Sequence, residues 1–188
     1  GLCHEGHPVH DPANCLVHTG AWGGLLLDAE PALVAELQRL FAEREDVLVL
    51  QSELGVENTS ILLNQHLSNP EIDLLKVDLD LCDDLVVADI LSAQIRPKVL
   101  HVEAQLIFPP DVVFRPKPAE DAEYESRMRQ SLPFVSSLAA FLVNSDYVLL
   151  YVEPPNAVLL RPDLAPLFPS TSRGSWAIWR DHYFCRAD

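Results

Sequence analysis

Carboxylates stand at three places in this chain where an apolar run ends. Asp78 and Asp80 follow one run, Glu103 closes a second and Asp28 closes a third. In an open α/β sheet, ligands bind at the carboxyl ends of the parallel strands. A carboxylate at that edge can accept hydrogen bonds from hydroxyl groups or act as a general base. We therefore expect these acids to surround a ligand.

The segment around Asp78 indicates the elements that position it. The apolar run 74–77 predicts a parallel strand that is buried on both faces. Residues 84–91 carry apolar side chains at helical spacing, and Arg96-Pro97 stops that helix before a second apolar strand at 99–103. The centre of the fold is thus predicted to be strand, helix, strand, with an acid at the exit of each strand.

Two further strand and helix pairs precede this centre. Residues 22–28 predict a buried strand, and Pro31 suits the first turn of a following helix. That helix has an apolar face made of Leu33, Val34, Leu37, Leu40 and Phe41. Residues 47–50 predict a third strand with Gln51 and Ser52 at its exit, and residues 61–67 predict a short helix.

The end of the chain changes pattern. Residues 136–143 predict a helix capped by serine. The apolar runs 147–153 and 157–161 are joined by only three residues, which cannot carry a crossover, so they predict an antiparallel hairpin. The aromatic tail 163–188 should pack against the rest. The predicted fold class is α/β, with a mostly parallel sheet and an antiparallel C-terminal hairpin.

Composition bounds the class of protein. The 188 residues and 48% apolar content predict one globular domain over 1–188. A net charge of −15 argues against binding to nucleic acid or to an anionic membrane surface. No apolar run reaches the roughly 20 residues that a membrane span needs. The four cysteines form no CxxC pair, which signals neither a disulfide scaffold nor a zinc site, so a reducing compartment such as the cytoplasm is favoured.

The start of the chain offers a second kind of chemistry, because histidine and cysteine are the usual zinc ligands. The candidates are Cys3, His4, His7, His10, Cys15 and His18. Their spacing matches no zinc signature. We favour a polar loop, with or without a short helix, over a metal site.

The order of these segments resembles the Rossmann-like sheet of the S-adenosylmethionine-dependent methyltransferases, in which the last strand is inserted antiparallel. The individual segments are similar to those of the FkbM-like branch over about Asn14 to Phe168. The matching stretches are the Trp-Gly-Gly-Leu-Leu-Leu-Asp-Ala-Glu-Pro run at 22–31, the Asp-x-Asp strand end at 75–80, the Pro-x-Val to Glu strand at 97–103, and the later pieces 137–138, 147–149 and 156–158.

The resemblance implies a site for S-adenosyl-L-methionine. Asp28 would bind the ribose hydroxyls, Gln51 and Ser52 would lie near the adenine, and the loop 1–6 would hold the aminocarboxypropyl end. The implied cofactor residues are Gly1, Glu5, Gly6, Asn14, Asp28, Gln51 and Ser52. The alternative for Asp28 is a structural one, in which it and Glu30 start the following helix favourably against the helix dipole.

The resemblance also implies O-methylation of a sugar or a small metabolite. Asp78, Asp80 and Glu103 are then the candidates for the general base or for positioning the acceptor. The chain departs from the family pattern in three places: Glu5-Gly6 replaces Asp-Gly, Leu81-Cys82 replaces Gly-Asn, and the family's first strand would lie before Gly1. Two alternatives therefore remain, a methyltransferase-like domain that only binds or supports, and a metal-dependent hydrolase that uses the histidine-rich start together with the aspartates.

Overall fold

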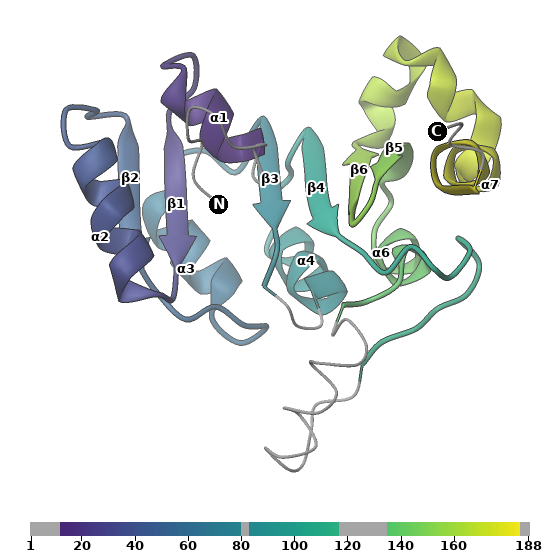
Figure 1. Cartoon of the computed structure of the whole chain (residues 1–188), viewed down its shortest axis with the longest axis horizontal. Coiled ribbons are helices and arrows are strands. Elements are labelled where there is room, and N and C mark those ends of the chain that lie inside the picture. Colours follow the sequence, from purple (N-terminus) through teal and green to yellow (C-terminus); the bar gives the residue numbers. More distant parts are fainter. Residues whose placement is uncertain (1–11, 80–82, 117–134, 185–188) are drawn as a thin grey trace. The chain divides into compact units, whose positions relative to one another are not determined.

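The computed structural model describes residues 12–79, 83–116 and 135–184 (Figure 1). The chain forms two compact units, Gly1–Leu54 and Gly55–Asp188. Each unit has its own β-sheet with helices packed on it. The predicted α/β class is confirmed in this coarse form, as a mixture of helices with parallel and antiparallel strands.

The first unit consists of helix α1 (Pro12–His18), strand β1 (Gly24–Asp28), helix α2 (Pro31–Leu40) and strand β2 (Val47–Gln51). The two strands are parallel, with Asp28 opposite Gln51. The predicted strand over 22–28 therefore exists and ends at Asp28, but β1 is only half-buried rather than buried. A sheet of two strands has little area with which to cover its own side chains.

A small apolar core holds the first unit together. It consists of Val17, Val34, Leu37, Phe41 and Val49, with Leu26 and Val47 packed against it. The apolar face predicted for α2 included Leu33 and Leu40. This part of the prediction is wrong, since each of these side chains is 39% exposed. Because α2 packs on a sheet of two strands, the buried face of the helix is narrower than the apolar face predicted from the sequence.

The second unit contains a sheet of four strands in the order β3 (Leu74–Val77), β4 (Val99–Glu103), β6 (Asn156–Leu160) and β5 (Val148–Glu153). β3 and β4 are parallel, and β6 runs antiparallel to both β4 and β5. The antiparallel C-terminal hairpin is therefore confirmed. The last strand is inserted between its two antiparallel neighbours instead of lying at the edge.

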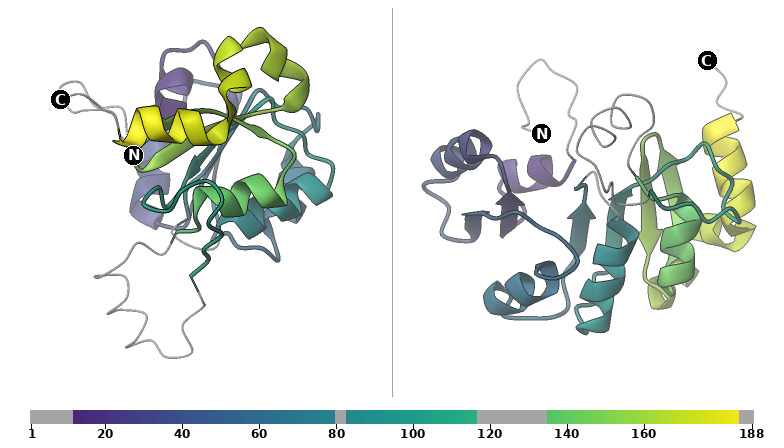
Figure 2. Two further views of the ribbon diagram at one scale, coloured as in Figure 1. Left: turned by 90° about the vertical axis from the view of Figure 1, so that its right-hand side faces the viewer. Right: turned by 90° about the horizontal axis from the view of Figure 1, so that it is seen from below.

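Helices complete the second unit. They are α3 (Thr59–His66), α4 (Asp83–Ser92), α6 (Leu138–Asn144), the 3₁₀ turns η1 (Pro162–Leu167) and η2 (Pro169–Arg173), α7 (Gly174–Trp179) and the π-helical turn η3 (Arg180–Phe184). Figure 2 shows α4 and α6 on one side of the sheet and α7 on the other. Trp179 anchors α7, because its indole N–H donates to the carbonyl oxygen of Leu106 at 2.9 Å.

Side-chain alternation along β4 separates the two faces of this sheet. Leu100 and Val102 are fully buried, whereas His101 and Glu103 are only partly buried. Because successive side chains of a strand point to opposite faces, His101 and Glu103 share one face and the two apolar residues share the other. The apolar row continues across the sheet through Leu159 and Ala157 of β6.

Three local predictions for the second unit need correction. β3 is not buried on both faces in the middle of a sheet, because within the described residues it pairs with β4 alone and so forms an edge. The helix predicted over 84–91 is present as α4 (Asp83–Ser92), but it stops before Arg96-Pro97 is reached, because Gln94 has a positive φ of 65°. Ser137 occupies the N-cap position of α6 without capping it, because its hydroxyl oxygen accepts a hydrogen bond from the Phe114 amide and its O–H donates to the carbonyl oxygen of Val112.

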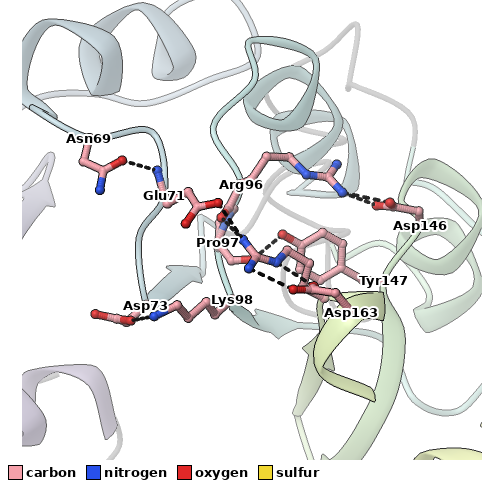
Figure 3. Close-up of polar contacts among 10 residues, drawn as sticks. Asn69, Glu71, Asp73, Arg96, Pro97, Lys98, Asp146, Tyr147 and Asp163 are labelled. Carbon is pink, nitrogen blue, oxygen red and sulfur yellow. Dashed lines mark hydrogen bonds and ion pairs between the residues drawn. The ribbon is translucent and has the colours of Figure 1, made fainter. Parts of the chain in front are cut away.

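Polar contacts join the start of β4 to the two antiparallel strands (Figure 3). Arg96 forms an ion pair with Asp146 at 2.8 Å, and the Tyr147 hydroxyl donates to the carbonyl oxygen of Pro97. Lys98 pairs with Asp73 at 2.6 Å across the strand start. These contacts lie at the amino-terminal ends of β3 and β4, at the edge opposite Glu103.

Candidate functional site

In the first unit the structure brings Asp28, Gln51 and Ser52 together at one edge of the sheet. Asp28 and Gln51 are opposite each other at the carboxyl ends of β1 and β2. The Ser52 amide donates to the carbonyl oxygen of Asp28 at 2.9 Å. Three of the predicted cofactor residues therefore form one cluster, at the edge where parallel strands present ligands.

The Asp28 carboxyl already has a structural role. Its Oδ1 accepts a hydrogen bond from the Glu30 amide at 2.8 Å, and Glu30 in turn accepts one from the Ala32 amide at 3.4 Å as the N-cap of α2. The structural alternative for the two acids is thus realised in the fold. It occupies one carboxylate oxygen of Asp28, and a carboxylate has two.

The rest of the predicted cofactor site falls outside the described residues. Gly1, Glu5 and Gly6 lie in the part of the chain that the structure does not describe, and so does the side chain of Asn14, whose backbone belongs to α1. The described residues supply a carboxylate, an amide and a hydroxyl at a strand end, which are groups able to hydrogen-bond to a nucleoside. The other half of the predicted site stays a prediction.

In the second unit the structure brings Asp78 and Glu103 together. β3 and β4 pair in register up to Val77 opposite Val102, so the next residue on each strand is one of these two acids. Their side chains are within hydrogen-bonding contact of each other. Asp80, the third predicted catalytic residue, lies outside the described residues.

Lys76 belongs to the same cluster and was missed by the sequence analysis. Its Nζ lies 2.6 Å from Oδ2 of Asp78, and its side chain is only 14% exposed. The spacing carried a signal, because residues two apart in a strand share a face. A lysine inside an apolar strand, two residues before an acid, was the pattern to look for.

Opposing effects act on the ionisation of Asp78. Partial burial disfavours its charged form, but the hydrogen bond and the charge of Lys76, together with the contact to Glu103, outweigh burial and hold the pKa of Asp78 below its usual range. Asp78 is therefore an anion at neutral pH, and one of its oxygens faces a cation.

The turn after Asp78 is fixed by a buried carboxylate. Asp83, the first residue of α4, is fully buried, and its Oδ2 accepts a hydrogen bond from the Leu79 amide at 3.0 Å. This contact holds the backbone next to Asp78. The predicted helix begins at the following residue, and the sequence pattern predicts no role for Asp83.

Asp84, the next residue, is a second fully buried acid with three partners. It accepts hydrogen bonds from Arg115 Nε at 2.5 Å, Ser136 Oγ at 2.5 Å and Asn144 Nδ2 at 2.6 Å. The cluster joins the start of α4 to both ends of α6. Since the protein occupies both oxygens of Asp84, we assign it a structural role.

The candidate residues are divided between the two units. Asp28, Gln51 and Ser52 belong to Gly1–Leu54, whereas Asp78 and Glu103 belong to Gly55–Asp188. The structure thus describes two clusters, each at the carboxyl ends of parallel strands. A common rim that unites Asp28 with the other two acids stays a prediction.

The described residues contain no group of three or more His, Cys, Asp or Glu that could hold a metal ion. Of the metal candidates, Cys3, His4, His7 and His10 lie outside the described part. Cys15 is disulfide-bonded. The cysteine spacing did not predict this bond, since it signalled no pairing.

Within the parts of the chain that are described, no helix combines the length and apolarity needed to cross a bilayer. Comparison of the chain with models of protein families, with curated proteins and with solved structures finds no match.

Proposed function

We propose that the chain is an S-adenosylmethionine-dependent methyltransferase that resembles the FkbM-like branch and methylates a hydroxyl of a sugar or a small metabolite. The insertion of β6 between β4 and β5, antiparallel to both, supports this proposal, because it matches the reversed last strand of methyltransferase sheets. The acids at the strand ends support it as well.

The observation that carries the proposal is the cluster of Asp28, Gln51 and Ser52. It puts a carboxylate at the carboxyl end of a parallel strand that leads into a helix, the arrangement in which an acid binds the hydroxyls of a nucleoside ribose. Ribose hydroxyls donate hydrogen bonds, and the carboxylate of Asp28 accepts them. Gln51 and Ser52 offer an amide and a hydroxyl beside Asp28 for hydrogen bonds to the adenine.

The acids of the second unit would act on the acceptor. The bound cofactor supplies an activated methyl group, so the protein contributes mainly proximity and, for a hydroxyl acceptor, a base. Asp78 is an anion beside Glu103 at the strand ends and can accept that proton, although its lowered pKa makes it a weaker base than an ordinary carboxylate. An acceptor hydroxyl would donate its proton to the Asp78 carboxylate as the oxygen is methylated.

The experiment is calorimetry of S-adenosylmethionine and S-adenosylhomocysteine binding to the full-length protein. We expect Asp28→Ala to weaken both at least about tenfold, equivalent to about 1.4 kcal/mol, with Asp28→Asn in between. Glu43→Ala is the matched control, because it removes an exposed carboxylate of the same unit that precedes β2. Absence of binding by the wild type, or equal affinity of Asp28→Ala and wild type, would overturn the proposal.

A second function, a methyltransferase-like domain without catalysis, is favoured by one observation. Asp28 Oδ1 is already used by the start of α2, so the acid has a reason to be present without any ligand. The same calorimetry separates the two functions when it is combined with a turnover assay. Binding of S-adenosylhomocysteine with no methyl transfer to any of a panel of sugars would favour the binding domain.

A further inference from the structure

The cluster at the ends of β3 and β4 has a definite arrangement of charge. Lys76 pairs laterally with His101, and Asp78 follows Lys76 by two residues as Glu103 follows His101. All four side chains therefore belong to the face of the sheet opposite Leu100 and Val102. Asp83 contacts the adjoining turn through the Leu79 amide and not through the carboxyl of Asp78.

A direct hydrogen bond between the carboxyl groups of Asp78 and Glu103 needs a proton on one of them, because two carboxylates are acceptors only and repel each other. The proton can reside on either partner. Lys76 makes the partners unequal, since its Nζ lies 2.6 Å from Oδ2 of Asp78 and its side chain is 86% covered, which limits screening by water. A positive charge next to one member stabilises the anion there.

We propose that Lys76 is a positioning residue that places the negative charge of the carboxyl pair on Asp78 and leaves the shared proton on Glu103. In this arrangement Asp78 accepts two hydrogen bonds, one from Lys76 and one from the protonated Glu103. The three side chains together carry no net charge. The consequence for catalysis rests on the proposed function. If the protein is a methyltransferase, this charge arrangement makes Asp78 the general base and not Glu103.

The proton balance of such a base is simple. Asp78 would take the proton of an acceptor hydroxyl, after which the pair holds two protons and Lys76 keeps its charge. Release of one proton to solvent restores the resting state. Glu103 donates to Asp78 throughout and touches no reacting atom in this scheme.

The test is a carbon-13 NMR titration of the side-chain carboxyls in the full-length protein, assigned with Asp78→Asn and Glu103→Gln. We expect Lys76→Met, which keeps most of the aliphatic stem, to move the Asp78 transition upward by about one pH unit or more. Lys98→Met is the matched control, because Lys98 makes an equivalent 2.6 Å pair with Asp73 at the opposite end of the same two strands. It should leave the Asp78 transition unchanged.

Two further variants keep the proposal testable if Lys76→Met does not fold. Lys76→Arg retains the charge and should retain the wild-type titration. Glu103→Gln replaces a protonated acid by an amide that also donates, so Asp78 should keep its low transition, whereas Glu103→Ala should raise it. Separate titration of both acids in the ordinary carboxyl range, or an Asp78 transition that is the same in every variant, would overturn the proposal.

The outcome is independent of the cofactor. The titration reports charge placement whether or not the protein binds S-adenosylmethionine, so failure of the proposed function leaves this measurement intact. In an active protein, Asp78→Asn should reduce methyl transfer at least about a hundredfold, in line with the loss of a general base. Glu103→Gln keeps a hydrogen-bond donor to Asp78, so it should reduce methyl transfer less than Asp78→Asn does.

Discussion

Tyr147 is a buried residue whose hydroxyl donates a hydrogen bond to the carbonyl oxygen of Pro97 (Figure 3). Burial raises the pKa of Tyr147 to about 12, and the charges of Arg96 and Arg161 oppose the shift. The tyrosine therefore stays neutral in the folded protein at pH values where an unfolded tyrosine, with a pKa of about 10, has ionised.

The sign of the resulting pH dependence follows from proton binding. Between about pH 10 and 12 the folded state holds a proton that the unfolded state has lost, so the free energy of unfolding falls as pH rises. The contribution of Tyr147 to the free energy of unfolding is fully present below pH 10. Its size is at most about 3 kcal/mol, from two pH units at about 1.4 kcal/mol each.

We predict that Tyr147→Phe lowers the free energy of unfolding by about 1 to 2 kcal/mol at pH 7, because it removes the donor for a buried carbonyl oxygen. Above pH 10 the wild type should lose stability more steeply than the variant. Urea unfolding at intervals from pH 7 to pH 11.5 measures both effects. Parallel alkaline curves for the two proteins would contradict the role assigned to Tyr147.

At the level of helices and strands, Asp84 is the main polar link in the second unit. Its carboxylate joins α4 to Ser136, which precedes α6, and to Asn144, the last residue of α6. Arg115 completes the cluster. Removal of one partner from a buried ionic cluster leaves the others without compensation. The Arg115 side chain is 33% exposed and can regain water, which moderates the loss.

We predict that Asp84→Ala lowers the free energy of unfolding by about 3 kcal/mol and that Asp84→Asn, which keeps one acceptor oxygen, lowers it by less. Asp111→Ala is the control, because Asp111 is an exposed acid of the same unit and should change stability by no more than about 0.5 kcal/mol. Urea unfolding at pH 7 decides between these outcomes. A loss below about 1 kcal/mol for Asp84→Ala would mean that the cluster does not support α6.

The elements themselves were largely predictable because their signals are local. The strand at 99–103, the strand ending at Asp28 and the antiparallel hairpin were all predicted, since apolar run length, turn residues and link length lie within a few neighbouring positions. The same reasoning placed Asp78 and Glu103 on adjacent strand ends, and they do meet.

The contacts that were not predicted, and the predictions that failed, depend on partners that are distant in the sequence. Asp84 binds residues more than 30 positions away, and Arg96 binds Asp146 50 positions away, which no periodicity reveals. Ser137 has the sequence of a cap, but the amide that competes for its hydroxyl oxygen belongs to Phe114 in another segment. β3 was predicted to be central because its composition is apolar, and composition does not tell how many strands pair with it.

At the scale of the whole molecule, the disulfide of Cys15 bears on the environment of the protein. Disulfides persist in oxidising compartments and are rare in the cytosol, so this bond argues against the reducing compartment expected from cysteine spacing. The strong negative charge of −15 is compatible with either environment.

We predict that Cys15 resists alkylation in denatured, unreduced protein and reacts after reduction, because a disulfide sulfur carries no thiol. Peptide mass spectrometry of the two samples measures the change directly. Alkylation of Cys15 in unreduced protein purified without reducing agent would show that the bond does not form, and the expectation of a reducing compartment would then stand.

The two units differ in how much apolar surface they bury, which predicts a difference in local stability. Among its described residues, the first unit has five buried apolar side chains around a sheet of two strands, and Leu48 of that sheet is 42% exposed. In the second unit, strands β4, β5 and β6 each contain fully buried side chains, among them Leu100, Leu149 and Leu159. Segments with few buried apolar contacts open more readily.

We predict that amide hydrogens of β1 and β2 exchange at least about tenfold faster than those of β4 and β6 in the intact protein, which corresponds to an opening free energy lower by at least about 1.4 kcal/mol. Hydrogen exchange followed by NMR or mass spectrometry measures this difference strand by strand. Val49→Ala should widen it, because Val49 belongs to the small core of the first unit alone. Equal protection of the two sheets would contradict the prediction, since five buried side chains would then be stabilising two strands as firmly as the larger core stabilises four.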